Sequence, residues 1–525
     1  MFSQQFDYWA IQEYCRGVST IKTRFKLTLF DLPQEIVDKS VYENAVKHLR
    51  DVRVVLPTLA ELADPATLPS SITSAADGIS ADDPHSANLY RVHWYNDENR
   101  SGLTEVPGYM VLGETLTGAA ASIVVVLGNR FPLIGAHKVL PAYACLATRI
   151  VSGQFDPARH RAIWPSTGNY CRGGIAISRI LGCRGVAVLP EGMSQERFDW
   201  LEGWVTEPAD IVRTPGSESN VKEIYDKCAE LSADSSNVIL NQFSEYANYL
   251  AHYQCTGRAF EKVFAYLKEQ RPGLNLAAFV AGTGSAGTLA AGDYLKTALG
   301  SRTVAVEPIE CPTMLYNGYG EHNIQGIGDK HIPLIQNTMN IDIIAGISDQ
   351  SCDHLNVLFN SDAGREYLIN RRDLDPKVVE DLSFLGLSGI ANVLASIKIA
   401  RLLDLGTDDV VITVATDSGA LYVSERERTE KTDFPDGFDQ VSAGEVYTRH
   451  MLGQSEEHML EMTRRDRRRV FNLGYYTWVE QQGVPLEDFE QRRDQSFWEG
   501  LQKTLPVWDA MIEEFNGHAG VNRPD

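Results

Sequence analysis

The sequence predicts an α/β fold, in which buried, mostly parallel strands alternate with helices. Between residues 106 and 424, short runs of Val, Ile and Ala alternate with stretches whose apolar residues repeat at helical spacing. Several of these runs are followed directly by turns rich in Gly and Ser, where open α/β sheets bind their ligands. The 525 residues are 43 % hydrophobic, which is enough apolar material for a large core.

Six strands and seven helices are expected in this central region. The strands are expected over residues 162–164, 185–189, 238–241, 277–281, 303–307 and 410–415. The helices are expected over residues 139–151, 173–181, 194–203, 221–232, 257–269, 287–299 and 388–403. The strands are short and continuously apolar, which is typical of a sheet covered by helices on both faces.

Helical segments are also expected on either side of the central region. Residues 34–52 carry apolar side chains near i, i+4 and i+8, whereas residues 64–87 are rich in Pro, Ser, Ala and Asp and predict a surface loop or mobile segment. Beyond residue 424 the chain is charged and then rich in aromatic residues, with helices expected over 456–472 and 485–515. Five arginines within 464–469 form either a solvated helix face or a site for a phosphate group or a partner.

The charge balance excludes some classes of partner. A net charge of −22 would repel nucleic acid and anionic membranes, so we expect neither as a partner. The longest apolar run, residues 117–127, is shorter than the ~20 residues of a membrane span, and the first residues lack the pattern of a secretory signal. The eight cysteines are scattered without a CxxC pair, which indicates reduced thiols, no metal site and a cytoplasmic location.

The first candidate for chemistry is Lys138, in the segment PLIGAHKVLP over residues 132–141. This lysine follows Gly-Ala-His and begins a helical run. A desolvated amine at such a place has a lowered pKa, which a Schiff-base lysine requires. Taken alone, the pattern fits an ordinary surface lysine better.

A second candidate segment, PSTGNYCRGG, covers residues 165–174. Ser166, Thr167 and Asn169 supply short polar side chains on a tight turn, and the helix that follows adds free backbone N–H groups. This combination suits a carboxylate or a phosphate. An ordinary helix N-cap with a glycine turn explains it equally well.

A third segment, AGTGSAGTL over residues 281–289, lies between an expected strand and an expected helix. Gly282, Gly284 and Gly287 allow close approach of the backbone to a ligand, and Ser285 and Thr288 add hydroxyl donors, so we expect a phosphate cup. The same glycines satisfy the dinucleotide pattern GxGxxG, which leaves a nicotinamide dehydrogenase as an alternative.

A fourth segment, VVITVATDSGALYVS over residues 410–424, ends a strand in Asp417, Ser418 and Gly419. A hydroxyl or carboxylate at this edge of a sheet can contact a heteroaromatic nitrogen, and a plain Asx or Ser turn is the alternative.

The order of these segments resembles the fold type II pyridoxal-phosphate enzymes, the family of cysteine synthase, cystathionine β-synthase, threonine dehydratase and the tryptophan synthase β chain. Four further stretches strengthen the resemblance: residues 165–204, beginning PSTGNYC and ending LEGW; Asn241-Gln242-Phe243 followed by YQCTG; IQGIGDKHIP at 324–333; and FLGLSGIAN at 384–392. The resemblance covers residues 106–424. It implies two three-layer α/β/α domains with mostly parallel sheets, flanked by helical N- and C-terminal extensions.

The resemblance also implies a division of the chain. Residues 106–165 and 241–424 would form a large cofactor-binding domain, and residues 166–240 a small mobile domain. Residues 1–105, with a mobile loop at about 64–87, and residues 425–525 would be the extensions.

Roles for individual residues follow from the same resemblance. Lys138 would bind pyridoxal phosphate and act as the acid and base at the substrate's Cα. His137 would lie near the cofactor phosphate, Asn169 would bind the cofactor's 3′-oxygen, and Ser418 would face its ring nitrogen. The phosphate would be cradled by Gly284, Ser285, Ala286, Gly287 and Thr288. The substrate carboxylate would be held by Ser166, Thr167, Gly168 and Gln242.

The resemblance implies an enzyme of amino-acid metabolism, most simply one that replaces a leaving group at Cβ through an aminoacrylate intermediate, as cysteine synthase does with O-acetylserine. The alternative is β-elimination by a desulfhydrase, dehydratase or ammonia-lyase; a catalytically inactive scaffold is a further alternative. A small amino-acid substrate and a homodimer are expected. Departures from cysteine synthases include Val139 directly after the lysine, Tyr170 in the substrate loop and Ala286 in the phosphate cup.

Overall fold

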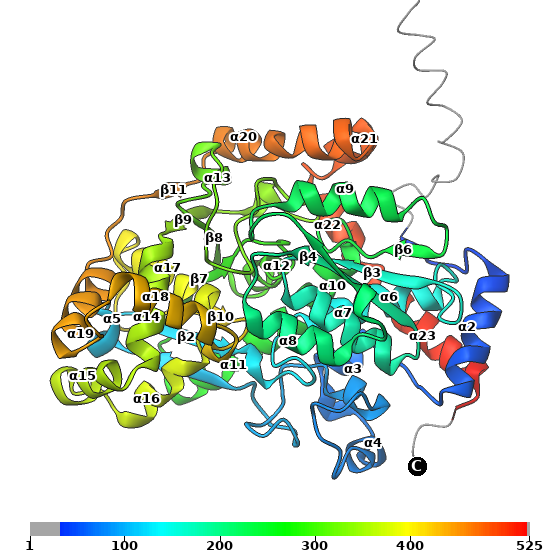
Figure 1. Ribbon diagram of the computed structural model, residues 1–525, viewed down its shortest axis with the longest axis horizontal. Coiled ribbons are helices and arrows are strands. Elements are labelled where there is room, and N and C mark those ends of the chain that lie inside the picture. The colour runs from blue at the N-terminus through cyan, green and yellow to red at the C-terminus, as the bar shows by residue number, and fades with distance from the viewer. Residues whose placement is uncertain (1–31, 522–525) are drawn as a thin grey trace, which may run out of the picture.

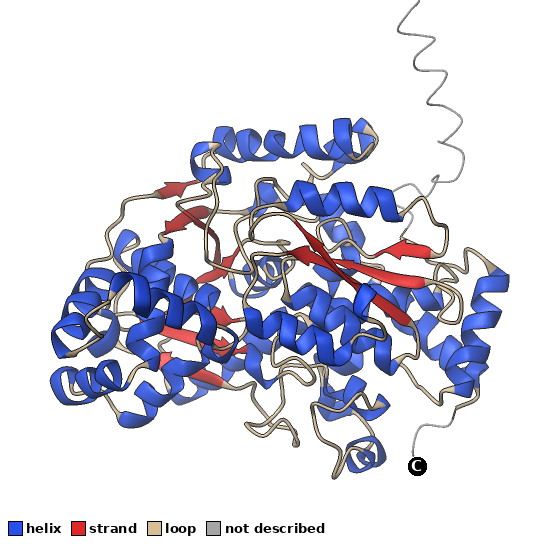
Figure 2. Cartoon of the chain, viewed as in Figure 1, coloured by secondary structure: helices blue, strands red, loops and turns tan. Residues whose placement is uncertain are grey.

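Strand pairing divides the chain into two sheets. The computed structural model describes residues 32–521, and Figure 1 shows its elements in chain order. One sheet has seven strands in the order β1-β2-β10-β7-β8-β9-β11, and the other has four in the order β5-β4-β3-β6. Helices flank the strands of both sheets (Figure 2), which confirms the predicted α/β fold.

The larger sheet is parallel except at its two edges. Its strands are β1 (Tyr109–Leu112), β2 (Ser122–Leu127), β7 (Asn275–Gly282), β8 (Arg302–Pro308), β9 (Ile343–Ile347), β10 (Asp409–Ala415) and β11 (Met459–Glu461). Only β1 and β11 pair antiparallel with their neighbours. Strand β10 lies centrally, with Thr413 opposite Val125 of β2 on one side and Val280 of β7 on the other. The carboxyl ends of β7 and β10 therefore meet at one edge of the sheet.

The smaller sheet is parallel throughout. Its strands are β3 (Arg161–Pro165), β4 (Arg184–Pro190), β5 (Ile211–Thr214) and β6 (Asn237–Ile239). The predicted division placed residues 161–165 in the large domain, but β3 pairs with β4 and β6 of the smaller sheet. Its hydrogen-bonding partners come later in the chain, which the apolar pattern of β3 alone does not reveal. We therefore propose that the boundary lies before Arg161; the remainder of the division stays a prediction.

Helices occur at all seven predicted places in the central region. They are α6 (Val139–Val151), α7 (Asn169–Ile180), α8 (Gln195–Trp204), α9 (Val221–Leu231), α11 (Gly257–Gln270), α12 (Leu289–Leu299) and α17 (Leu387–Leu402). Helix α6 is apolar except at Thr148 and Arg149, and all of its residues but Arg149 are buried, as expected for a helix inside the core. Its N-cap is Lys138, so the core fixes the position of that lysine.

Further helices complete the central region and the C-terminal part. They are α5 (Glu114–Thr117), α10 (Tyr246–Ala251), α13 (Thr313–Tyr316), α14 (Asp349–Asn360), α15 (Asp362–Arg372), α16 (Pro376–Asp381), α18 (Val423–Asp433), α19 (Gln440–Val446), α20 (Arg464–Tyr475), α21 (Leu486–Gln491), α22 (Gln495–Gln502) and α23 (Leu505–Ala519). The helix expected over 456–472 begins late, because β11 occupies its first part. In the arginine cluster, Arg467 binds Asp342 and Arg469 donates to the carbonyl of Met314, so these two arginines hold α20 in place.

The N-terminal part of the described chain packs against its C-terminal part. Helix α2 (Lys39–Asp51) lies beside α23 (Figure 1), where the rings of Tyr42 and Phe515 are 5.3 Å apart and Asn516 bonds both backbone groups of Leu56. Helix α3 (Leu59–Ala63) follows.

The loop predicted over residues 64–87 is wrong in part. This stretch forms two short helical segments, Pro65–Thr67 and α4 (Ser70–Ala75), and Ile72 and Ala81 are buried. The Pro- and Ser-rich composition obscured these short helical segments and the burial of some of their apolar residues.

Across residues 32–521 no single helix is long and apolar enough to span a membrane. The sharply bent pair Pro376–Phe384 and Leu387–Leu402 has the required length and composition only when the two helices are taken together. The seven cysteines in this range are unpaired and buried, and Cys15 lies outside it. No group of three His, Cys, Asp or Glu in this range is arranged to hold a metal ion.

The contact between α2 and α23 yields a prediction about stability. Phe515 is fully buried, so Phe515→Ala should lower the free energy of unfolding by about 3–5 kcal/mol. Glu513→Ala, at an exposed position of the same helix, should change it by less than about 0.5 kcal/mol. Denaturant unfolding measures both, and equal effects would show that the two ends of the described chain do not stabilise each other.

Candidate active site

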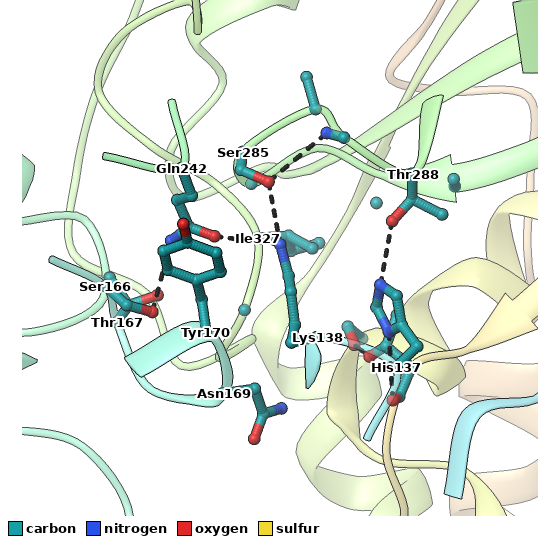
Figure 3. A pocket seen from close by; sticks show the side chains of 18 of the residues that line it. His137, Lys138, Ser166, Thr167, Asn169, Tyr170, Gln242, Ser285, Thr288 and Ile327 are labelled. Carbon is teal, nitrogen blue, oxygen red and sulfur yellow. Dashed lines mark hydrogen bonds between the residues drawn. The ribbon is translucent and has the colours of Figure 1, made fainter. Parts of the chain in front are cut away.

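A pocket lies where the carboxyl ends of strands from both sheets meet. Its walls come from the start of α6, from the turns after β3, β6, β7 and β10, from the start of α17, and from a loop near residue 327 (Figure 3). The lining residues include twelve of particular interest: His137, Lys138, Ser166, Thr167, Asn169, Gln242, Gly284, Ser285, Ala286, Gly287, Thr288 and Thr416. The pocket thus brings together all but two of the site residues predicted from the sequence.

Lys138 lies at the centre of these walls. Its Nζ donates hydrogen bonds to Gln242 Oε1 at 3.1 Å and to Ser285 Oγ at 2.9 Å (Figure 3). Burial lowers its pKa to about 8, against the opposing effect of nearby carboxylates, Asp329 foremost. A fraction of this amine is therefore uncharged near neutral pH, which a nucleophilic or proton-accepting lysine requires.

His137 is buried and neutral. Burial, reinforced by the charge of Lys138, lowers its pKa to about 3. Its Nδ1 lies 3.3 Å from the carbonyl oxygen of Thr416, so Nδ1 must carry the proton, and Nε2 then accepts from Thr288 Oγ1 at 3.2 Å. The ring stacks on Trp94 with centroids 5.9 Å apart. His137 therefore orients the Thr288 hydroxyl rather than carrying charge.

The turn after β7 leaves no room for side chains at Gly284 and Gly287. A Cβ on Gly284 would lie 2.4 Å from the carbonyl oxygen of Gly326, and one on Gly287 would lie 2.1 Å from Asn248 Oδ1. Ser285 Oγ accepts from Lys138 and from Asn248 Nδ2, at 3.1 Å for the latter, which leaves its own proton for a ligand. With the start of α12 directly after it, the turn offers backbone and hydroxyl donors to an anion.

The turn after β3 forms the opposite wall. Ser166 Oγ accepts from the backbone N–H of Gly168 at 3.0 Å and from Gln242 Nε2 at 3.3 Å, so its hydroxyl proton also remains for a ligand. Gly168 itself does not line the pocket. It has φ 150° as the N-cap of α7, and a Cβ there would lie 2.5 Å from Arg197 Nε, so it shapes the turn through its backbone.

Asn169 is held by two charged residues. Its Nδ2 donates to Asp417 Oδ2 at 2.6 Å, and its Oδ1 accepts from Arg172 at 2.9 Å. Asp417 is buried and also accepts from the Tyr422 hydroxyl at 2.9 Å. These bonds fix the amide at the pocket wall, where the predicted contact with a cofactor oxygen stays a prediction.

The predicted position of Ser418 needs correction. Ser418 does not line the pocket, whereas Thr416, two residues earlier, does. Strand β10 ends at Ala415, Asp417 turns toward Asn169, and Ser418 begins a 3₁₀ turn that leads the chain away. The Thr416 hydroxyl lies 3.0 Å from that of Ser388 at the start of α17. We therefore propose Thr416 for the role predicted for Ser418.

Sequence reasoning missed several lining residues, namely Gly326, Ile327, Asp329, Ser388, Asn392 and Thr416. The loop that carries the first three was noticed as a matching segment, IQGIGDKHIP, without roles for its residues. An acidic residue beside two glycines in that segment is the signal that points to Asp329.

The donor set fits pyridoxal phosphate. A buried amine of lowered pKa suits the cofactor's aldehyde, and a turn whose glycines exclude a Cβ suits its phosphate. The hydroxyls of Thr416 and Ser388 suit the polar atoms of its ring. These groups lie in one pocket, on elements from two sheets.

Comparison with known proteins agrees with this fit. The family model described as pyridoxal-phosphate dependent enzyme matches residues 118–354. A cysteine synthase of Staphylococcus aureus is 30 % identical over 263 residues, which are 50 % of this chain and 74 % of that protein. A probable cysteine synthase of Bacillus subtilis is 30 % identical over 297 residues, which are 55 % of this chain and 85 % of that protein.

A solved structure shares the fold. A hydrogen sulfide-producing enzyme from Fusobacterium nucleatum superposes with a TM-score of 0.51 at 22 % identity, over 63 % of this chain and 99 % of that chain.

The tight glycine turn can be tested by enlarging one residue. Gly284→Ala would push a methyl group against the Gly326 carbonyl, so we expect affinity for pyridoxal phosphate to fall about tenfold or more. Gly203→Ala is the matched control, because a Cβ there meets open space. Titration of the apoenzyme with cofactor measures both. Unchanged affinity in Gly284→Ala would place the phosphate elsewhere.

A second pair of variants tests whether Thr416, rather than Ser418, faces the ring of the cofactor. Thr416→Val removes a hydroxyl from the pocket, so it should shift the absorbance of the bound cofactor and cost about 1 kcal/mol of cofactor affinity. Ser418→Ala should leave the spectrum and the affinity unchanged. The opposite pattern would restore the role predicted for Ser418.

Proposed function

The chain belongs to the family of pyridoxal-phosphate-dependent enzymes, and we propose that it catalyses β-replacement on an amino acid with a leaving group at Cβ, such as O-acetylserine. The observation that carries the proposal is the position of Lys138, whose amine lies between the glycine turn and the hydroxyl-lined turn. The relatives named cysteine synthase support this reaction class.

Each wall of the pocket has a part in the proposed reaction. Pyridoxal phosphate supplies an electron sink for negative charge at the substrate's Cα. The turn at Ser285 and Thr288 binds the phosphate, and the hydroxyls of Ser166 and Thr167 bind the substrate carboxylate. Lys138 Nζ takes the proton from Cα and later returns one to it.

Gln242 couples the two walls. Its Oε1 accepts from Lys138, and its Nε2 donates to Ser166. The amide therefore fixes the distance between the acid–base amine and the group that binds the carboxylate, which presents Cα to Nζ. Such positioning makes the proton transfer effectively intramolecular.

The proposal is tested with purified holoenzyme and O-acetylserine, with and without sulfide. Formation of cysteine that depends on sulfide supports replacement; release of pyruvate alone would favour the elimination reaction instead. A homodimer and a cytoplasmic location stay predictions.

Lys138→Ala should abolish the visible absorbance of the lysine-bound cofactor and lower kcat by about 10²–10⁴-fold, because it removes both the attachment point and the acid–base amine. Lys262→Ala, at an exposed lysine of α11, should retain both properties. If Lys138→Ala keeps the same absorbance band as the wild type, Lys138 does not bind the cofactor.

A further inference from the structure

Two buried carboxyl groups near Lys138 have no part in the reaction as described so far. Asp329 lines the pocket and is 6 % exposed, and Glu218, between β5 and α9, is 1 % exposed. Within residues 32–521, no side-chain or backbone group bonds Asp329 Oδ2 or Glu218 Oε2. A buried carboxyl oxygen without a protein partner, in the wall of a substrate pocket, is available to a ligand.

The surroundings of Asp329 leave it able to exchange a proton near neutral pH. Burial raises its pKa to about 7, and Lys138 is the cation that opposes this rise. Tyr225 and Cys311 also face Asp329, but burial raises the pKa of each, so both keep their protons.

Glu218 is the remaining charged neighbour of Asp329. Burial raises the pKa of Glu218 to about 8, against the opposing effect of Thr167 and the backbone of Gly326. Repulsion between the two carboxylates disfavours their joint ionisation.

Resting on the proposed β-replacement, we propose that Asp329 is a second catalytic acid–base residue, which takes the proton from a nucleophile that arrives protonated, such as a thiol. As the sulfur lone pair forms the bond to the substrate's Cβ, the S–H bond breaks and its proton passes to Asp329. The proton held by Lys138 is added at Cα. Loss of its proton returns the Lys138 amine to its uncharged form. Asp329 passes the thiol proton to solvent, where it balances the acetate anion released earlier, so both groups return to their starting states.

This arrangement sets a preference among nucleophiles. A neutral thiol gains a proton acceptor, Asp329, inside a pocket lined by buried side chains. An anion such as azide has no proton to give and is repelled by the carboxylate of Asp329. The pocket therefore favours neutral, protonated nucleophiles over small anions.

The test compares wild-type holoenzyme with Asp329→Asn, using O-acetylserine and either 2-mercaptoethanol or azide. With the thiol, kcat of the variant should fall about 10²-fold or more, whereas the rate with azide should stay the same or rise. The wild-type rate with thiol should rise with pH through about 7, as Asp329 loses its proton, beyond the rise due to the thiol itself. The rate of the Asp329→Asn variant with thiol should lack this additional rise with pH.

An infrared measurement gives a readout that does not depend on turnover. The wild type should lose protonated-carboxyl absorbance as the pH rises through about 7, and Asp329→Asn should lose less of it by the contribution of one carboxyl, since Glu218, Glu307 and Asp349 also titrate near this pH. Asp353→Asn is the matched control, because Asp353 is a partly buried carboxyl of raised pKa that bonds Asn323 outside the pocket. It should leave the thiol rate unchanged.

The outcomes separate the two proposals. If the wild type consumes O-acetylserine with both nucleophiles and Asp329→Asn keeps the wild-type thiol rate and pH profile, the role of Asp329 is refuted and the β-replacement stands. If the wild type reacts with neither nucleophile, the proposed function itself fails.

Discussion

The burial of one amine, Lys138 Nζ, is the constraint on which the site depends. An amine removed from water must find hydrogen-bond acceptors inside the protein, and this one finds Gln242 and Ser285. Gln242 follows β6 of the smaller sheet, and Ser285 follows β7 of the larger one. The lysine is therefore satisfied only when the edges of both sheets lie together. The same contacts that satisfy the amine also place the carboxylate-binding turn opposite the phosphate-binding turn.

The anion site is built without net positive charge. The chain carries −22 overall, and His137, the residue beside Lys138, is neutral because burial suppresses its protonation. The donors are instead backbone N–H groups and hydroxyls whose acceptor positions are already occupied by protein groups, as for Ser285 and Ser166. Such donors are local and fixed, so the overall charge of the protein does not determine what this pocket binds.

The sequence predicted those parts of the fold that short-range patterns determine. Helix α6 was predicted with its observed bounds, because it is apolar throughout and begins directly after Lys138. The pairing of β3 with the smaller sheet was not predicted, since its partners are distant in the chain. The sequence did not predict that Thr416, rather than Ser418, lines the pocket, because the course of the chain after β10 depends on the bond between Asp417 and Asn169. Asp329 was missed because its loop reaches the pocket only in the folded chain.

Burial of the ionisable groups of the pocket lowers the stability of the fold, and the direction of each pKa shift gives the pH range in which it does so. The folded-state pKa of Lys138 is lowered from 10.5 to about 8, so its burial destabilises the protein below about pH 8, and this cost disappears as the pH rises through 10.5. The pKa of Asp329 is raised from 3.8 to about 7, so its burial destabilises the protein above about pH 7. Near neutral pH both costs are present together, offset in part by the attraction of the two charges. Because burial brings the two pKa values close together, to about 8 for Lys138 and about 7 for Asp329, a proton passes between these two groups at little cost. A core evolved for stability alone would hold apolar residues at both positions. Two groups that exchange a proton readily are instead what acid–base catalysis at neighbouring carbons of one substrate requires.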